Sequence, residues 1–284
     1  MFGIGALATL AGILSLNATP AIPGLHRNHP LDEAQVGKVL IDELRCAACH
    51  DGIAAAPAPS APDLTQVGSR LNPEFLRKFI EAPSRHDPGT AMPDLLAGRT
   101  EPERKELAAS LSAYLLSVGE GKAQPAPPLE KDDGTGKRLF HETGCIACHA
   151  PRDQGATEIP GPANVGLGHV RAKYRPGGLV GFLLEPLKVR PAGRMPDMGL
   201  SLKESQALSA YLLSGKGGES PTSEKPEEAS VAQIAAGKVA FTELRCISCH
   251  QVENAPLAAA VPPAPPFSKL DLNRGCLSKS PGNA

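Results

Sequence analysis

The sequence has few aromatic side chains: tryptophan is absent, and aromatic residues make up 4% of the 284 positions. Small domains with so little apolar bulk have marginal cores, so a further apolar component is expected inside the fold. The charges almost cancel, leaving a net charge of -1. Nothing in this balance suggests binding to nucleic acid or to an anionic membrane surface, and we expect no nucleic-acid partner.

The cysteines follow a pattern, since six of the seven belong to three copies of Cys-x-x-Cys-His. The copies are Cys46, Cys49 and His50; Cys145, Cys148 and His149; and Cys246, Cys249 and His250. Two thiols about one helical turn apart can reach two vinyl groups on one porphyrin edge, while the adjoining histidine presents a ring nitrogen to the iron. The pattern predicts three covalently attached haem c groups, which would also provide the missing apolar bulk.

Two other interpretations explain the cysteine pairs less well. A Cys-x-x-Cys pair also occurs in thioredoxin-like redox sites and as half of a zinc site, but the first requires a strand and helix around it and the second requires further ligands. Neither accounts for a histidine after the second cysteine in all three copies. The seventh cysteine, Cys276, is expected to be an incidental thiol.

The motifs divide the chain into repeated units, because their first cysteines lie 99 and 101 positions apart. The segment Gly37–Cys46 returns almost unchanged as Gly237–Cys246 and more loosely as Gly136–Cys145, and each copy predicts a short helix that leads into the motif. Stretches at 119–136 and 215–230 are rich in glycine, proline and charge, which is typical of linkers. We therefore expect an all-α fold of tandem haem domains: unit 1 at residues 30–119, unit 2 at 132–216, and a partial unit 3 at 231–284.

Units 1 and 2 also share the order of their later helices. After a proline-containing loop, proline and spaced apolar residues predict a helix over 72–80, with a counterpart over 178–184. Each unit then has a capping box and the identical string Leu-Ser-Ala-Tyr-Leu-Leu-Ser, at 111–117 and 208–214, which predicts a closing helix with a core-facing stripe.

Methionine is scarce, with four in the chain, yet Met92 and Met195 both begin a Met-Pro-Asp sequence between these two helices. A neutral thioether sulfur favours reduced iron, so we predict both as the second axial ligand of their haem. The alternative is that each merely fills a gap in the loop. Met198 is the nearby competitor in unit 2 but has no equivalent in unit 1.

This order of motif, proline loop, helix, Met-Pro and closing helix resembles class I cytochrome c, here in tandem. The resemblance covers residues 34–118 and 134–214, and 231–284 only in part. It implies electron transfer, haem attachment outside the cytoplasmic membrane, and backbone carbonyls at Pro62, Pro162 and a third candidate, Pro266, that accept from the proximal histidine.

The third unit departs from this pattern, because the 34 residues after His250 contain no methionine and no sign of the later helices. Two explanations stay open: the chain is a fragment of a longer protein, which we favour, or the third haem has a different sixth ligand.

The N-terminal segment indicates in which cellular compartment the protein resides. Residues 1–25 carry no charge and combine an apolar run with small residues and proline, the outline of an export signal. A membrane anchor is less favoured, because Asn17, Pro20 and Pro23 shorten the apolar stretch. We expect an exported, periplasmic or otherwise extracytoplasmic protein.

Two classes of function remain. The first is an electron carrier that exchanges electrons with redox partner proteins and has no catalytic residues. The second is a haem enzyme, or a cytochrome subunit of a dehydrogenase or peroxidase complex, with the third haem as its open site. We favour the carrier, because two His/Met irons would be closed to substrate. The remaining histidines, including His141 four residues before Cys145, are expected to be structural or on the surface.

Overall fold

The computed structural model describes residues 30–53, 61–87, 90–118, 133–159, 161, 164–215, 228–253 and 264–270. Within these ranges the chain is helical, and its only extended pairings are isolated bridges without a sheet. The predicted all-α class is confirmed. The proposed export segment, the interiors of both linkers and Cys276 lie outside the described residues.

Unit 2 is built around two crossing helices. Its elements are α6 (Thr135–Glu142), the 3-10 turn η2 (Cys145–Ala147), α7 (Val170–Lys173), α8 (Pro176–Leu184), α9 (Pro186–Val189) and α10 (Leu202–Ser214). One apolar cluster joins Phe140 of α6, Leu179 of α8 and Leu208 of α10. The predicted capping box starts α10, since the Ser201 side chain accepts from the backbone of Glu204, whose carboxylate accepts from Ser201 in return.

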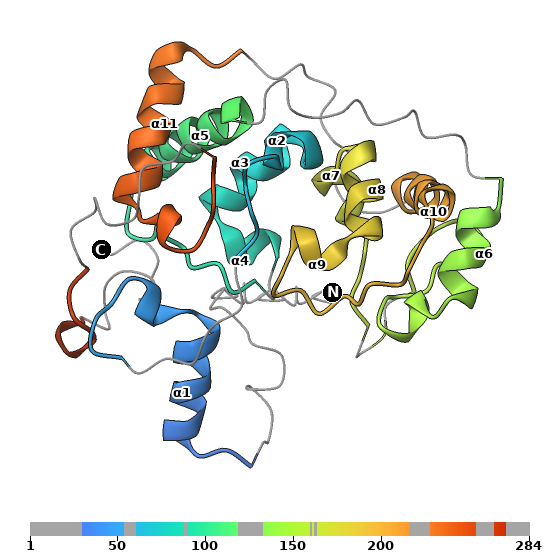
Figure 1. Ribbon diagram of the computed structural model, residues 1–284, viewed down its shortest axis with the longest axis horizontal. Helices are drawn as coiled ribbons and strands as arrows, with labels where there is room; N and C mark the ends of the chain where they lie inside the picture. The colour runs from blue at the N-terminus through green and yellow to red at the C-terminus, as the bar shows by residue number, and fades with distance from the viewer. Residues whose placement is uncertain are drawn as a thin grey trace, which may run out of the picture.

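Unit 1 repeats this arrangement, but its first helix comes from another part of the chain. Its own elements are α2 (Val67–Arg70), α3 (Pro73–Glu81), α4 (Pro83–His86) and α5 (Glu101–Val118). The helix packed across α5 is α11 (Val231–Glu243), which leads into the third motif, and Phe241 shares a core with Leu76 and Leu111. Figure 1 shows the orange α11 lying against the green α5.

The first helix that the structure describes lies apart from this core. Helix α1 (Glu33–Glu43), with a capping box at Asp32 and Gln35, has no buried residue. It leads into η1 (Cys46–Ala48), and the residue after that motif, Asp51, accepts a backbone hydrogen bond of 3.1 Å from Phe267 of η5 (Phe267–Lys269). In Figure 1 the blue α1 lies at the lower edge of the molecule, away from α5.

Units 1 and 2 meet through equivalent segments before α3 and α8. Leu71 and Tyr174 form an antiparallel bridge, in which the Asn72 amide donates to the Lys173 carbonyl and the Arg175 amide donates to the Arg70 carbonyl, each at 2.9 Å. Because both units contribute the same segment, the contact has an approximate twofold character. The bridge joins the two domains beside α3 of unit 1 and α8 of unit 2.

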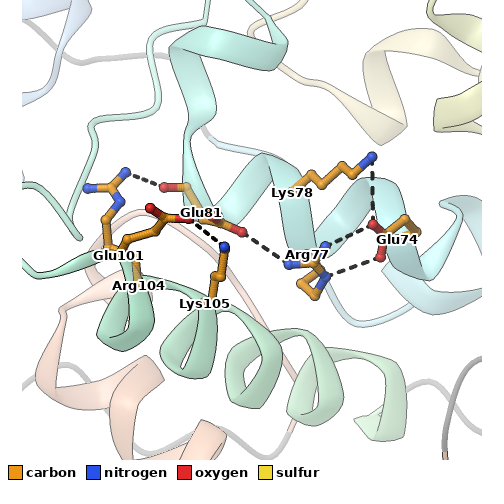
Figure 2. Close-up of polar contacts among 7 residues, drawn as sticks. All are labelled: Glu74, Arg77, Lys78, Glu81, Glu101, Arg104 and Lys105. Carbon is orange, nitrogen blue, oxygen red and sulfur yellow. Dashed lines mark hydrogen bonds and ion pairs between the residues drawn. The ribbon is translucent and has the colours of Figure 1, made fainter. Parts of the chain in front are cut away.

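Polar side chains reinforce the contact between α3 and α5. Figure 2 shows Arg77 between Glu74 and Glu81 on α3, and Arg104 of α5 donating to the carbonyl of Glu81. The Arg77 and Glu81 side chains are 30% and 21% exposed, so the ion pair itself stabilises the helix by well under about 1 kcal/mol. The Arg104 contact matters more, because it satisfies a carbonyl at the end of α3, where the helix leaves its last carbonyls unpaired.

Candidate functional site

All three motifs adopt the same backbone turn. The residue before the first cysteine is left-handed in each, at Arg45 (φ 54°), Gly144 (φ 95°) and Arg245 (φ 61°). A left-handed residue after the last helical turn ends a helix and redirects the chain. The histidine amide then donates to the carbonyl of the first cysteine at 2.9 Å in every copy. The two cysteines and the histidine are thereby held within one short turn.

Each motif histidine is oriented through its Nδ1 atom by a backbone carbonyl. The distances are 2.7 Å from His50 to Pro265, 3.2 Å from His149 to Val165, and 2.9 Å from His250 to Pro62. A carbonyl only accepts, so Nδ1 carries the proton and Nε2 is the nitrogen left to bind a metal. Burial lowers the pKa of His250, which the bond to Pro62 opposes in part, and this favours the neutral imidazole that coordinates iron.

The carbonyl partners differ from those that the resemblance implies. Pro62 does accept from a motif histidine, but from His250 rather than from His50 of its own unit. In unit 3 the acceptor is Pro265 and not Pro266, and it serves His50. Pro162 lies outside the described residues, and His149 uses Val165. The loops differ in length and sequence, so the position of a proline did not identify the acceptor.

A glycine allows the first and last helices of each domain to cross closely. A Cβ on Gly136 would lie 2.1 Å from the carbonyl oxygen of Ala207, and a Cβ on Gly237 would lie 1.9 Å from that of Ser110. Such distances are far inside van der Waals contact, so only glycine fits at either crossing. Gly37, at the equivalent position of α1, has nothing within 4 Å of a Cβ.

The residues present fit a haem. Cys145, Ile146 and Met195 pack against the core of unit 2, and Cys246 and Ile247 pack against the core that α11 shares with unit 1. The second and third motifs therefore lie at the edge of an apolar core, each next to a histidine whose Nε2 is available. In addition, the buried Nη2 of Arg245, adjoining Cys246, has no hydrogen-bond partner among the described residues. A cationic group left without a partner beside the motif suits an anionic substituent such as a haem propionate.

The first and third motifs are neighbours in space. Burial raises the pKa of the Cys246 thiol to about 12, and the nearby Cys249 and Cys49 add to this shift. Burial also raises the pKa of Cys249, with Arg45 opposing the shift and Cys49 adding to it. Cys49 of the first motif, and Arg45 just before that motif, are thus close enough to influence the pKa values of the cysteines in the third motif.

The Met-Pro-Asp loop of unit 1 is tied to α5. Asp94 in the unit 1 loop accepts from the Nη2 of Arg104 at 2.8 Å, and the Met92 amide donates to the Thr90 hydroxyl at 3.2 Å. Both methionines are half-buried, and Met195 contacts the unit 2 core. Met198 is 39% exposed. These positions agree with the preference for Met195 over Met198, but iron ligation stays a prediction.

Two arginines that tie loops to the closing helices α5 and α10 carry no signal in the sequence. Arg104 joins the end of α3 and the Met92 loop to α5. Arg152, three residues after His149, is buried and donates to the carbonyls of Tyr211 and Leu212 at the end of α10. An isolated arginine in a loop has no periodicity or partner spacing that would identify it beforehand.

Of the other histidines, His141 has a hydrogen-bond partner close to it in the sequence. His141 Nδ1 bonds to the Lys137 carbonyl at 2.8 Å, and its ring lies edge-on to Phe140. Burial lowers the pKa of His169, which lies just before α7. Neither residue belongs to a group of three metal-binding side chains, and the described ranges contain no such group. No helix within those ranges has the length and apolarity needed to cross a lipid bilayer.

The fold and its motifs define a multihaem c-type protein. A sequence model of the family described as Cytochrome c matches residues 34–119 and 134–216, which together make up more than half of the chain. The chain therefore belongs to the cytochrome c family and contains tandem domains of it. This membership implies a haem c electron carrier, with a third Cys-x-x-Cys-His motif outside the matched regions. No curated protein and no solved structure matches the chain.

Proposed function

We propose that the protein is a triple-haem electron carrier that passes single electrons between partner proteins outside the cytoplasmic membrane. Haem c, when bound, supplies a one-electron couple between ferric and ferrous iron. The observation that carries the proposal is the same motif geometry in three places, with each histidine ring fixed by a backbone carbonyl through Nδ1.

The protein's own residues have three roles in this proposal. The paired cysteines form the thioether bonds: Cys46 with Cys49, Cys145 with Cys148, and Cys246 with Cys249. The Nε2 atoms of His50, His149 and His250 bind iron, and the carbonyl on Nδ1 raises their basicity. Met92 and Met195 supply the sixth ligand for two of the three irons, which raises the reduction potentials of those two centres.

A second candidate function follows from the ligand count. Within this sequence, two Met-Pro-Asp sequences accompany three motif histidines. This candidate requires that one of the three irons has no thioether ligand and is open to small molecules. An open iron is what a peroxidase or another haem enzyme requires, so this candidate is a redox enzyme that uses the two other haems as an electron supply.

Peroxide turnover separates the two candidates, and carbon monoxide binding tests the methionine assignments. For the haem-loaded full chain, the carrier predicts that the reduced protein binds about one carbon monoxide per three haems, and that peroxide is consumed no faster than by a free haem peptide. Peroxide reduction many-fold faster than by that peptide would replace the carrier by the enzyme. If carbon monoxide bound all three haems, both methionine assignments would be wrong.

A further inference from the structure

We propose that the first and third haem motifs are exchanged in the folded chain. The iron held by His250 then shares its domain with Met92, whereas the iron held by His50 does not. This inference rests on the proposed haem function, but it concerns which histidine is paired with which methionine.

The backbone contacts of the two motifs are reciprocal. His250 bonds to Pro62, 188 positions away, and His50 bonds to Pro265, 215 positions away, whereas His149 in unit 2 finds its acceptor only 16 positions along its own loop. The residues that follow the histidines are exchanged as well. The Leu64 amide donates to Gln251 at 2.9 Å, and the Phe267 amide donates to Asp51 at 3.1 Å.

The third unit also provides the helix that closes unit 1. In unit 2 the buried residues of α6 are Gly136, Leu139 and Phe140. The equivalent residues of α11 are buried in the same way, namely Gly237, Ala240 and Phe241. In α1 the equivalents are Gly37, Leu40 and Ile41, and no residue of that helix is buried. Helix α11 thus occupies the place in unit 1 that α6 occupies in unit 2.

An aromatic pair explains why α11 fits there better than α1. In unit 2 the rings of Phe140 and Tyr211 lie 5.7 Å apart, and in unit 1 the rings of Tyr114 and Phe241 lie 5.6 Å apart with a similar tilt. Aromatic pairs at such distances add stabilisation beyond the apolar area that they bury. The first unit has Ile41 at this position, so only the third unit can supply the ring that faces Tyr114.

A pair of matched glycine substitutions tests the exchange. In Gly237→Ala the new Cβ would collide with the Ser110 carbonyl and with the Cβ of Tyr114, at 1.9 and 2.8 Å, so α11 cannot seat on α5. In Gly37→Ala the new methyl group meets no atom within 4 Å. The readout is the proton NMR spectrum of the fully reduced, haem-loaded chain. There, a ligand methionine gives a methyl signal that the porphyrin ring current shifts far upfield.

The unmodified protein should show two such signals, and Met92→Ala assigns one of them to unit 1. Gly237→Ala should remove the Met92 signal and keep the Met195 signal, whereas Gly37→Ala should keep both. Loss of the Met92 signal in Gly37→Ala, or its persistence in Gly237→Ala, overturns the exchange, because the first motif would then complete unit 1.

A second measurement needs no substitution in the core. In the reduced full chain with labelled aromatic rings, Tyr114 should show nuclear Overhauser contacts to Phe241, and the absence of these contacts overturns the exchange. Haem content is measured on the same sample. Three haems without the Tyr114–Phe241 contact refute the exchange alone, whereas a chain without covalent haem refutes the proposed function, whichever helix covers α5.

Discussion

Replacing Arg152 by methionine should destabilise unit 2, because this arginine fastens the loop after the second haem motif to the closing helix. Its side chain is 2% exposed. Its Nη1 donates to the carbonyls of Tyr211 and Leu212, at 3.2 and 3.1 Å, and its guanidinium lies 5.4 Å from the centre of the Tyr211 ring. These carbonyls belong to the last turn of α10, where no amide of the helix can reach them.

The magnitude follows from these contacts. Two hydrogen bonds from a charged donor contribute about 3 kcal/mol together, and the contact with the tyrosine ring adds about 1 kcal/mol. Burial of the charge offsets part of this gain, since desolvation lowers the pKa of Arg152 and its Nε has no hydrogen-bond partner among the described residues. Methionine keeps the packing of the stem. We therefore expect a loss of about 2 kcal/mol, which is about 10 °C in the melting temperature of a domain of this size.

Thermal unfolding followed by circular dichroism on the haem-loaded chain measures the effect. The matched control is Arg138→Met, which removes an ion pair with Glu142 between side chains that are 58% and 60% exposed and should change stability by less than about 0.5 kcal/mol. If Arg152→Met lowered the melting temperature no more than Arg138→Met, the buried arginine would not be fastening the loop to α10.

Two further predictions concern a ligand and a buried base. Met195→Ala should lower the reduction potential of the unit 2 haem and allow carbon monoxide to bind its iron. Met198→Ala should change neither property. Spectroelectrochemical titration of both variants, with and without carbon monoxide, measures these effects. Burial lowers the pKa of Lys173, which lies over the rings of Phe75 and Tyr174, to about 8. The unfolded chain therefore binds more protons between about pH 8 and 10.4, so the free energy of unfolding should rise by about 1 to 3 kcal/mol across that window. Denaturant titrations of Lys173→Met should show no such rise, and an equal rise in both proteins would mean that another group causes it.

The helices of units 1 and 2 were predictable because their sequence patterns are local. The helix predicted over 72–80 forms α3 (Pro73–Glu81), and the one predicted over 178–184 forms part of α8 (Pro176–Leu184). Proline in the first turn and apolar residues on one face determine such a helix without reference to distant residues. The identical string at 111–117 and 208–214 forms the buried face of α5 and α10 for the same reason.

The pairing of helices was not predictable from those patterns. Helices α1 and α11 share the glycine at the crossing and the residues that lead into the motif, so both match the same site on α5. The choice depends on differences such as Ile41 against Phe241, whose effect appears only once Tyr114 is placed opposite. Sequence order favoured α1, whereas the contacts in the structure favour α11.

The motif cysteines and histidines were predicted from spacing, since the chemistry of haem attachment requires that spacing, and Met92 and Met195 were predicted from their repeated Met-Pro-Asp sequence. The groups that hold them were not. The carbonyl acceptors Pro265 and Val165 contribute only backbone atoms, so their side chains carry no information about the contact. Arg104 and Arg152 act through a single long side chain that reaches another element, and their partners are distant in sequence.

The central claim is that all three motifs hold haem covalently in one electron-carrying chain. The most direct test is an alkaline pyridine haemochrome assay on protein matured in an export-competent host, set against protein concentration and combined with mass spectrometry of motif peptides. The account predicts three haems per chain, one on each motif peptide, and all three should remain attached after denaturation. A value near two would mean that one motif is unused and would contradict the three-haem claim, while a value near zero would contradict the entire account.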